Sequence, residues 1–134
     1  MEITKPLINM DNNTQKFDLE DRLVAFACLI LDVCDMLPGT KAGSNLEHQL
    51  SKSGTAPALM YGEAQAAESR ADFLHKMKLC LKELRETRIN LRIIKEKPLI
   101  KNTKVDKAFD EVDQLIRIFV KSIETARANN VVRK

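Results

Sequence analysis

Hydrophobic positions recur every three or four residues along four separate stretches of the chain, which is the spacing of amphipathic α-helices. The breaks between the stretches fall at Pro38-Gly39, just before Ser69, and at Pro98. The pattern predicts helices over residues 18–37, 44–67, 69–97 and 103–128. Because the connections are short, consecutive helices should run antiparallel, and we expect an all-α fold, an antiparallel up-down four-helix bundle.

Three predicted helices begin with a capping box, in which Ser or Thr is followed three residues later by an acidic residue. The pairs are Ser44 with Glu47, Ser69 with Asp72, and Thr103 with Asp106. Each pair follows a break and precedes an apolar run, so the three boxes support one another. Inside the second helix, Pro57 removes a backbone hydrogen bond, and we expect a kink or local loosening there.

With 134 residues and a mass of 15.2 kDa, the chain has room for one domain. We expect a flexible N-terminal arm at 1–17, the bundle at 18–128 and a C-terminal tail at 129–134. Aromatic residues make up only 4%, which argues against a β-rich fold. The longest apolar run, Leu23 to Leu31, is too short for a membrane span and no signal peptide is visible, so we expect a cytoplasmic protein.

The chain offers little material for catalysis. Its only histidines are His48 and His75, and Asp72 with His75 supplies a small part of a metal-binding bundle's ligand set. Its glycines do not match a phosphate-binding loop. The sequence therefore predicts no enzyme, metal or cofactor. The cysteines, Cys28, Cys34 and Cys80, lie in apolar helical stretches and are expected to be buried, reduced thiols.

Charge is distributed unevenly between the two halves of the chain. Residues 1–67 carry 5 Lys+Arg and 9 Asp+Glu, whereas residues 68–134 carry 17 and 10. Basic residues follow one another at steps of three or four along the third predicted helix: Lys78, Lys82, Arg85, Arg88, Arg92 and Lys95. Such a strip can follow a phosphate backbone and predicts binding of RNA or DNA. The alternative is a solvated helix face whose charges are offset by Glu83, Glu86 and Glu96.

Both the first and the third predicted helix carry more apolar surface than one packing face requires. In the third helix, Leu79, Ile89 and Ile93 lie away from the face formed by residues such as Met77 and Leu84. In the first helix, Val24, Cys28 and Leu31 form a second apolar row. Surplus apolar surface on a small bundle predicts a homo-oligomer, with Leu79, Ile89 and Ile93 in its interface. Scattered surface apolar residues are the alternative.

Several segments together resemble one known bacterial family. They are QLSKSGT at 49–55, YGEA at 61–64, Ser69 with Asp72-Phe73, Lys76-Met77, and LKELRET at 81–87. The chain resembles, over roughly residues 18–128, the four-helix-bundle proteins encoded in intervening sequences of 23S ribosomal RNA genes. The resemblance implies homo-oligomers, with pentamers a recurring form. A related group, the accessory proteins of diversity-generating retroelement reverse transcriptases, implies nucleic-acid binding through a basic surface. Most members have no established activity.

Two positions depart from the family pattern. Met60 stands where members usually have Asn, and Asn90 stands where they often have Trp. Glu63 is retained, and we expect it to make a structural hydrogen bond or ion pair. Two functions remain open: a non-enzymatic homo-oligomer that binds nucleic acid through the basic strip, and an interaction scaffold that docks a partner protein such as a reverse transcriptase.

Overall fold

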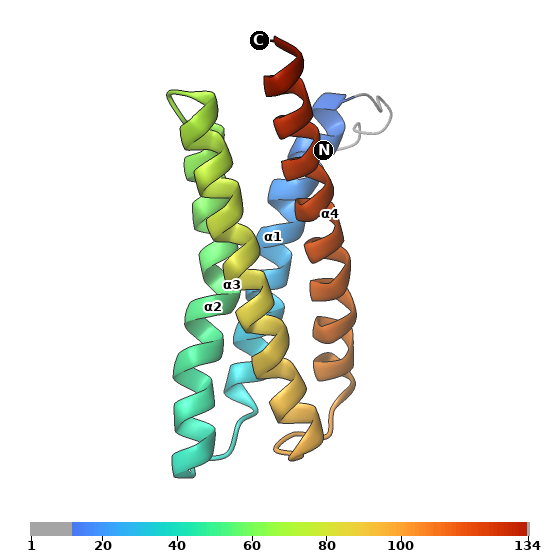
Figure 1. Ribbon diagram of the computed structural model, residues 1–134. Helices are drawn as coiled ribbons and strands as arrows, with labels where there is room; N and C mark the ends of the chain where they lie inside the picture. Colours follow the sequence, from blue (N-terminus) through green and yellow to red (C-terminus); the bar gives the residue numbers. More distant parts are fainter. Residues whose placement is uncertain (1–11, 134) are drawn as a thin grey trace.

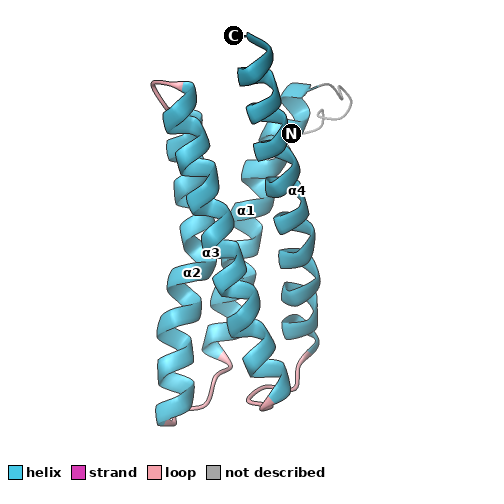
Figure 2. Ribbon diagram, in the orientation of Figure 1, coloured by secondary structure: helices cyan, strands magenta, loops and turns pink. Residues whose placement is uncertain are grey.

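The computed structural model describes residues 12–133, which form four helices, with side chains described for 19–129. The helices are α1 (Asn12–Asp35), α2 (Lys41–Gln65), α3 (Arg70–Glu96) and α4 (Thr103–Arg133). They lie side by side and alternate in direction (Figure 1), and short loops join them (Figure 2). Successive helices pack on one another, and α4 also contacts α1. The predicted four-helix bundle is confirmed.

One face of every helix contributes to a continuous buried core. Tyr61 and Phe119 meet edge to face across it, with ring centroids 6.1 Å apart. The side chains with no more than 2% of their surface exposed include Leu23, Phe26, Ile30, Leu50, Met77, Leu84, Leu91, Ile94, Leu115 and Phe119. The helical spacing in the sequence anticipates this core. Between α1 and α4, the bundle is also closed by two ion pairs, Arg22 with Glu111 at 2.9 Å and Lys104 with Asp32 at 3.2 Å.

The starts of α2 and α3 show which capping residues operate. Ser69 caps α3, because its side chain accepts a hydrogen bond from the Asp72 N–H at 3.0 Å, as predicted. The start predicted at Ser44 is wrong. Thr40 caps α2 by accepting a hydrogen bond from the Gly43 N–H at 3.1 Å, and Ser44 lies inside the first turn. Thr40 is the first residue that can fold back on the helix after the Pro38-Gly39 turn.

The cap of α4 and the outer ends of the bundle also differ from prediction. Asn102, not Thr103, lies before the helix, and its Oδ1 accepts a hydrogen bond from the Lys104 N–H at 2.8 Å. Residues 12–17 and 129–133, expected in an arm and a tail, are helical, because α1 begins at Asn12 and α4 ends at Arg133. The remainder of the expected arm, residues 1–11, lies outside the described residues.

Helix α2 stays helical on both sides of Pro57, so the expected loosening does not interrupt it. One turn earlier, Gly54 packs directly against α1. A Cβ placed on Gly54 would lie 2.5 Å from Cγ2 of Ile30, which is fully buried. The absence of a side chain at this position therefore permits the close approach of α1 and α2.

The three cysteines are free thiols in different surroundings. Cys34 and Cys80 are buried, as expected, and burial raises the pKa of the Cys80 thiol to about 12. The prediction that Cys28 is buried is wrong, because it shares the outward face of α1 with Val24 and Leu31. No helix within residues 12–133 combines the length and the hydropathy that crossing a membrane requires.

Candidate nucleic-acid interface

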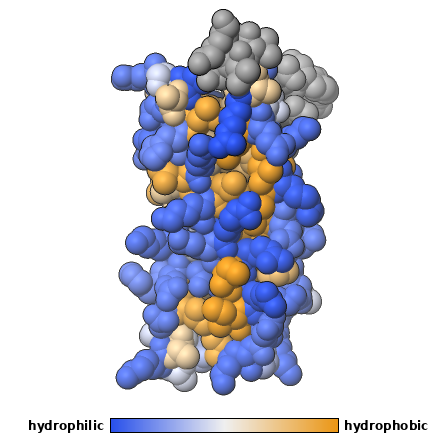
Figure 3. Space-filling model, viewed as in Figure 1, coloured by the Kyte–Doolittle hydropathy of each residue, from blue (hydrophilic) through white to orange (hydrophobic). Residues whose placement is uncertain are grey.

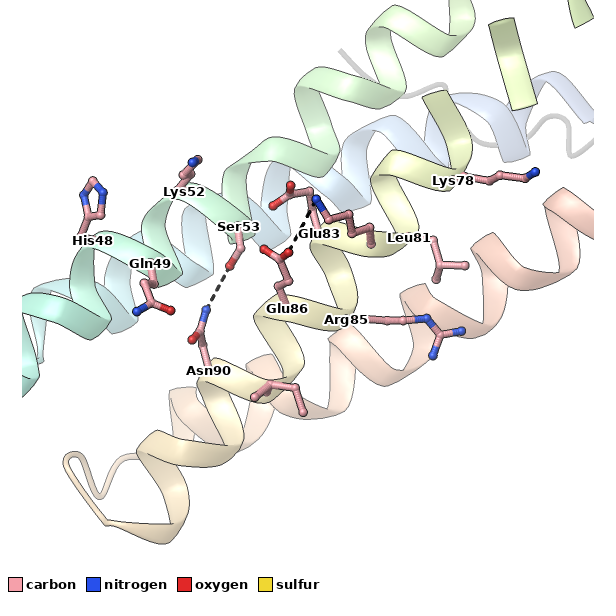
Figure 4. A pocket seen from close by; sticks show the side chains of 12 residues that line it. His48, Gln49, Lys52, Ser53, Lys78, Leu81, Glu83, Arg85, Glu86 and Asn90 are labelled. Atoms are coloured by element: carbon pink, nitrogen blue, oxygen red, sulfur yellow. Dashed lines mark hydrogen bonds and ion pairs between the residues drawn. The ribbon is translucent and has the colours of Figure 1, made fainter. Parts of the chain in front are cut away.

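The basic strip lies on the outer side of α3, because the core residues of this helix all face the opposite way. Lys78, Lys82, Arg85, Arg92 and Lys95 are exposed, and Arg88 is partly buried. Figure 4 shows Lys78 and Arg85 extending away from α2. The structure thus places all six predicted residues on one helix, but their surroundings divide them into two groups.

The carboxyl-terminal half of the strip is engaged in pairing. Arg88 Nε lies 2.6 Å from Asp113 Oδ1, and Lys95 Nζ lies 3.1 Å from Asp106 Oδ1, so both bridge α3 to α4. Both cations also lie over the Phe109 ring, 4.9 and 4.8 Å from its centroid. These two residues therefore hold helices together. In the same half of α3, Arg92 pairs within the helix with Glu96 at 2.7 Å.

The amino-terminal half of the strip is much less engaged. Lys82 Nζ lies 3.9 Å from Glu86 Oε2 in an exposed pair of the kind that contributes little stability. Lys78 and Arg85 have no ion-pair partner among the described residues. These three side chains keep their charge available to an anionic ligand.

An open groove of about 820 Å³ runs between α2 and α3 beside these cations (Figure 4). Its lining residues are His48, Gln49, Lys52, Ser53, Lys78, Leu81, Lys82, Glu83, Arg85, Glu86, Ile89 and Asn90. A smaller groove of about 360 Å³ between α3 and α4 includes Arg117. Arg85 and Ile89 line both grooves and form the ridge between them. Sequence reasoning missed Lys52 and Arg117, because only the packing of α2 and α4 on α3 brings them here.

Three polar side chains are buried where α2 meets α3 beside the larger groove. Ser53, Thr87 and Asn90 are each no more than 6% exposed. Thr87 Oγ1 lies 2.9 Å from Ser53 Oγ and 2.8 Å from the Glu83 carbonyl oxygen, and Asn90 Nδ2 lies 3.4 Å from Ser53 Oγ. Burial, and secondly the charge of Glu86, raise the pKa of the Glu83 carboxyl. The groove therefore has cations at its rim and polar groups beneath it.

The other residues singled out in the sequence have simple surroundings. Glu63 accepts a hydrogen bond from Lys76 Nζ at 3.0 Å, an ion pair that links α2 to α3. His75 is exposed, and the backbone N–H of Asp72 is engaged by the α3 cap. Among the side chains described for residues 19–129, no group of three His, Cys, Asp or Glu could hold a metal ion.

Apolar side chains are exposed at the positions expected for an oligomer interface. Ile89 is 51% exposed and Ile93 46%, while Leu79 is partly buried. Val24 and Leu31 on α1 are 50% and 45% exposed. Figure 3 shows hydrophobic side chains at the surface among the charged ones on the face seen in Figure 1.

The sequence and the fold were compared with known proteins. A family model described as 23S rRNA-intervening sequence protein matches residues 15–121, most of the chain. The chain belongs to this family. Among solved structures, a protein of unknown function from the S23 ribosomal protein family of Bacteroides thetaiotaomicron superposes with a TM-score of 0.72 and 25% identity, covering 78% of this chain and 96% of that one. No curated protein matches the chain. Family membership and the all-helical fold thus agree, and the family as described carries no stated biochemical activity.

Proposed function

We propose that this member of the 23S rRNA-intervening sequence family binds single-stranded nucleic acid, RNA in particular, through the amino-terminal half of the outer face of α3. The observation that carries the proposal is the exposure of Lys78 and Arg85 without ion-pair partners among the described residues. An unpaired cation keeps its full charge for a phosphate, and each phosphate contact releases counterions. Lys82, Lys52 and Arg117 enlarge the same cationic surface.

The proposed binding involves no catalytic step and no cofactor. Lysine and arginine head groups hold phosphates through charge and hydrogen bonds, so the surface can act by binding alone. Of the six residues predicted from the sequence, Lys78, Lys82 and Arg85 are assigned to the nucleic acid. Arg88 and Lys95 are assigned to the contact between α3 and α4, because their charges already face Asp113 and Asp106.

We further propose that copies of the chain associate through the apolar rows of α1 and α3. The exposed carboxylates Glu20, Asp21 and Asp35 flank the α1 row, whereas Arg92 lies next to Ile93 on α3. Opposite charges therefore favour α1 of one copy against the carboxyl-terminal half of α3 in the next. A contact between two different surfaces closes into a ring when its rotation permits, consistent with the pentamer that the family resemblance implies. Lys78 and Arg85 lie further along α3 and stay accessible.

The nucleic-acid assignment is tested by charge reversal. Binding of a labelled single-stranded RNA is measured across a salt series for the natural protein and for the double variant Lys78→Glu/Arg85→Glu. Affinity should fall, and the slope of log K against log salt should shrink by about 2, one for each lost phosphate contact. Lys107→Glu, an equally exposed site on α4, is the matched control and should change the slope far less. An unchanged slope in the double variant would refute the assigned surface.

The second candidate is a protein-interaction scaffold, favoured by the exposed apolar row on α1. The family resemblance suggests a nucleic-acid enzyme such as a reverse transcriptase as the partner. Capture of such an enzyme should survive nuclease treatment and high salt and be lost in Leu31→Glu. Light scattering on the same variant tests association between copies, and Ile93→Glu should dissociate the oligomer to the same extent. If neither variant changes the solution mass, the two rows are not the interface.

A further inference from the structure

The amide of Asn90 is buried with most of its hydrogen-bonding capacity unused. The side chain is 6% exposed, and its one hydrogen bond within the described residues runs from Nδ2 to Ser53 Oγ. A primary amide has two N–H donors and a carbonyl acceptor. One N–H and Oδ1 of Asn90 therefore have no partner within the described residues, a state that costs about 1–3 kcal/mol for a buried group.

The neighbouring hydroxyl groups fix the orientation of this amide. A carbonyl oxygen can only accept, so the single hydroxyl proton of Thr87 goes to the Glu83 carbonyl, 2.8 Å away. The Ser53 hydroxyl then donates to Thr87 Oγ1 and accepts from Asn90 Nδ2. Figure 4 shows the nitrogen of Asn90 toward Ser53 and its oxygen turned away from Ser53. The unused N–H and the oxygen remain for a molecule that enters the groove.

We propose that the groove between α2 and α3 binds an unstacked nucleobase that carries an exocyclic amine beside a ring nitrogen, as adenine and cytosine do, with Asn90 contacting both groups. This inference rests on the proposed nucleic-acid function and names what the surface recognises. The amine donates to Asn90 Oδ1 and the ring nitrogen accepts from Nδ2, the pairing by which asparagine reads adenine.

The lining of the groove selects among the bases. Glu83 and Glu86 place carboxylate oxygens in it, which accept from a second amine hydrogen and repel the carbonyl oxygens of uracil and guanine. Ile89, half exposed at the rim, offers apolar surface to the ring of the base. Lys52 and Lys82 also line the groove and can hold the adjoining phosphates. The volume of about 820 Å³ lies within the usual range for small-molecule sites.

The test compares labelled oligonucleotides of equal length, oligo(A), oligo(C), oligo(U) and an abasic strand, at one salt concentration. The natural protein should bind oligo(A) and oligo(C) about 5- to 150-fold more tightly than oligo(U), the effect of one two-point amide contact. Asn90→Leu should abolish this preference while leaving abasic-strand affinity and the salt slope unchanged. The comparison of oligo(A) with oligo(C) decides between a purine and a pyrimidine. Because leucine removes a buried amide without leaving a large cavity, this variant should unfold at or above the temperature of the natural protein, which checks its folding.

Two results separate this inference from the proposed function. Equal affinity for all four strands, or a preference that persists in Asn90→Leu, would overturn the base site and leave phosphate binding standing. Titration with adenosine monophosphate and cytidine monophosphate, followed by NMR of the Asn90 side-chain amide, provides the complementary measurement. Saturable shifts of that amide without binding of any oligonucleotide would support the site and refute the proposed function. No binding of either kind would refute both.

Discussion

The contact between Gly54 and Ile30 makes a quantitative prediction about the packing of α1 on α2. In Gly54→Ala, the new Cβ would lie 2.5 Å from Ile30 Cγ2, 2.8 Å from Cγ1 and 3.0 Å from Cβ. Ile30 is fully buried, so it cannot move into solvent, and the helices must separate or the side chain must leave its preferred rotamer. Overpacking of this kind costs about 1–3 kcal/mol.

Alanine also favours helix over glycine by about 1 kcal/mol, which offsets part of this cost. The net expected change is a loss of about 1–2 kcal/mol in the free energy of unfolding. With a urea m-value of roughly 1–3 kcal/mol per molar, the unfolding midpoint should fall by about 0.5–1 M. Urea titration followed by circular dichroism at fixed protein concentration measures the shift, since association between copies would otherwise add to it.

Gly62→Ala is the matched control in the same helix. A Cβ on Gly62 meets nothing within 4 Å and the residue is exposed, so this variant should gain up to about 1 kcal/mol. In addition, Ile30→Ala should lessen the penalty of alanine at position 54, because it removes both γ-carbons that the new methyl group meets. If Gly54→Ala is as stable as Gly62→Ala, the close approach of α1 and α2 at this point is wrong.

Three further predictions concern caps, thiols and protonation. Ser69→Ala should lose about 1 kcal/mol of stability, whereas Ser44→Ala should change it by less than about 0.5, and equal losses in thermal unfolding would contradict the cap assignment. Iodoacetamide at pH 8 and low protein concentration should modify Cys28 well before Cys80, whose raised pKa keeps it a thiol; mass spectrometry of the peptides gives the order. Burial first, and then a neighbouring carboxylate, raise the pKa of Glu83 above 4.5 in the folded chain, so the folded state binds this proton more tightly than the unfolded state. Stability should therefore rise as pH falls toward 4.5, and Glu83→Gln should be more stable at pH 7 and lose that part of the pH dependence in urea titrations.

The periodicity of apolar residues was sufficient to predict the fold, because a helix in a bundle must bury one stripe along its whole length. Residues such as Met77, Leu84 and Leu91 fall on the predicted face and are buried. The exact helix starts depend on loop geometry instead. Thr40 and Ser44 are equally good capping residues by type, and only the path of the chain after Pro38 decides between them. A Cβ on Gly43 would collide with the Pro38 carbonyl oxygen, which shows how closely that loop packs on the helix.

The candidate site was only partly predictable, for a different reason. The spacing of the basic residues places them on the outside of α3, but their partners depend on how α3 and α4 are aligned lengthwise. Asp113 is 25 residues from Arg88, and no local pattern connects them. The polar patch under the groove did leave a signal: Thr87 and Asn90 occupy core-facing positions between Leu84 and Ile94 where apolar residues are expected.

The clamp of Arg88 and Lys95 around the Phe109 ring constrains how relatives of this protein can diverge. An acidic residue at position 88 would face Asp113 and lose the ring, so it should arise only together with a basic residue at position 113. Lys78 and Arg85 carry no such obligation to α4. Aligned sequences should therefore show correlated exchange along one flank of α3, and along the other flank only such variation as the bound polymer permits.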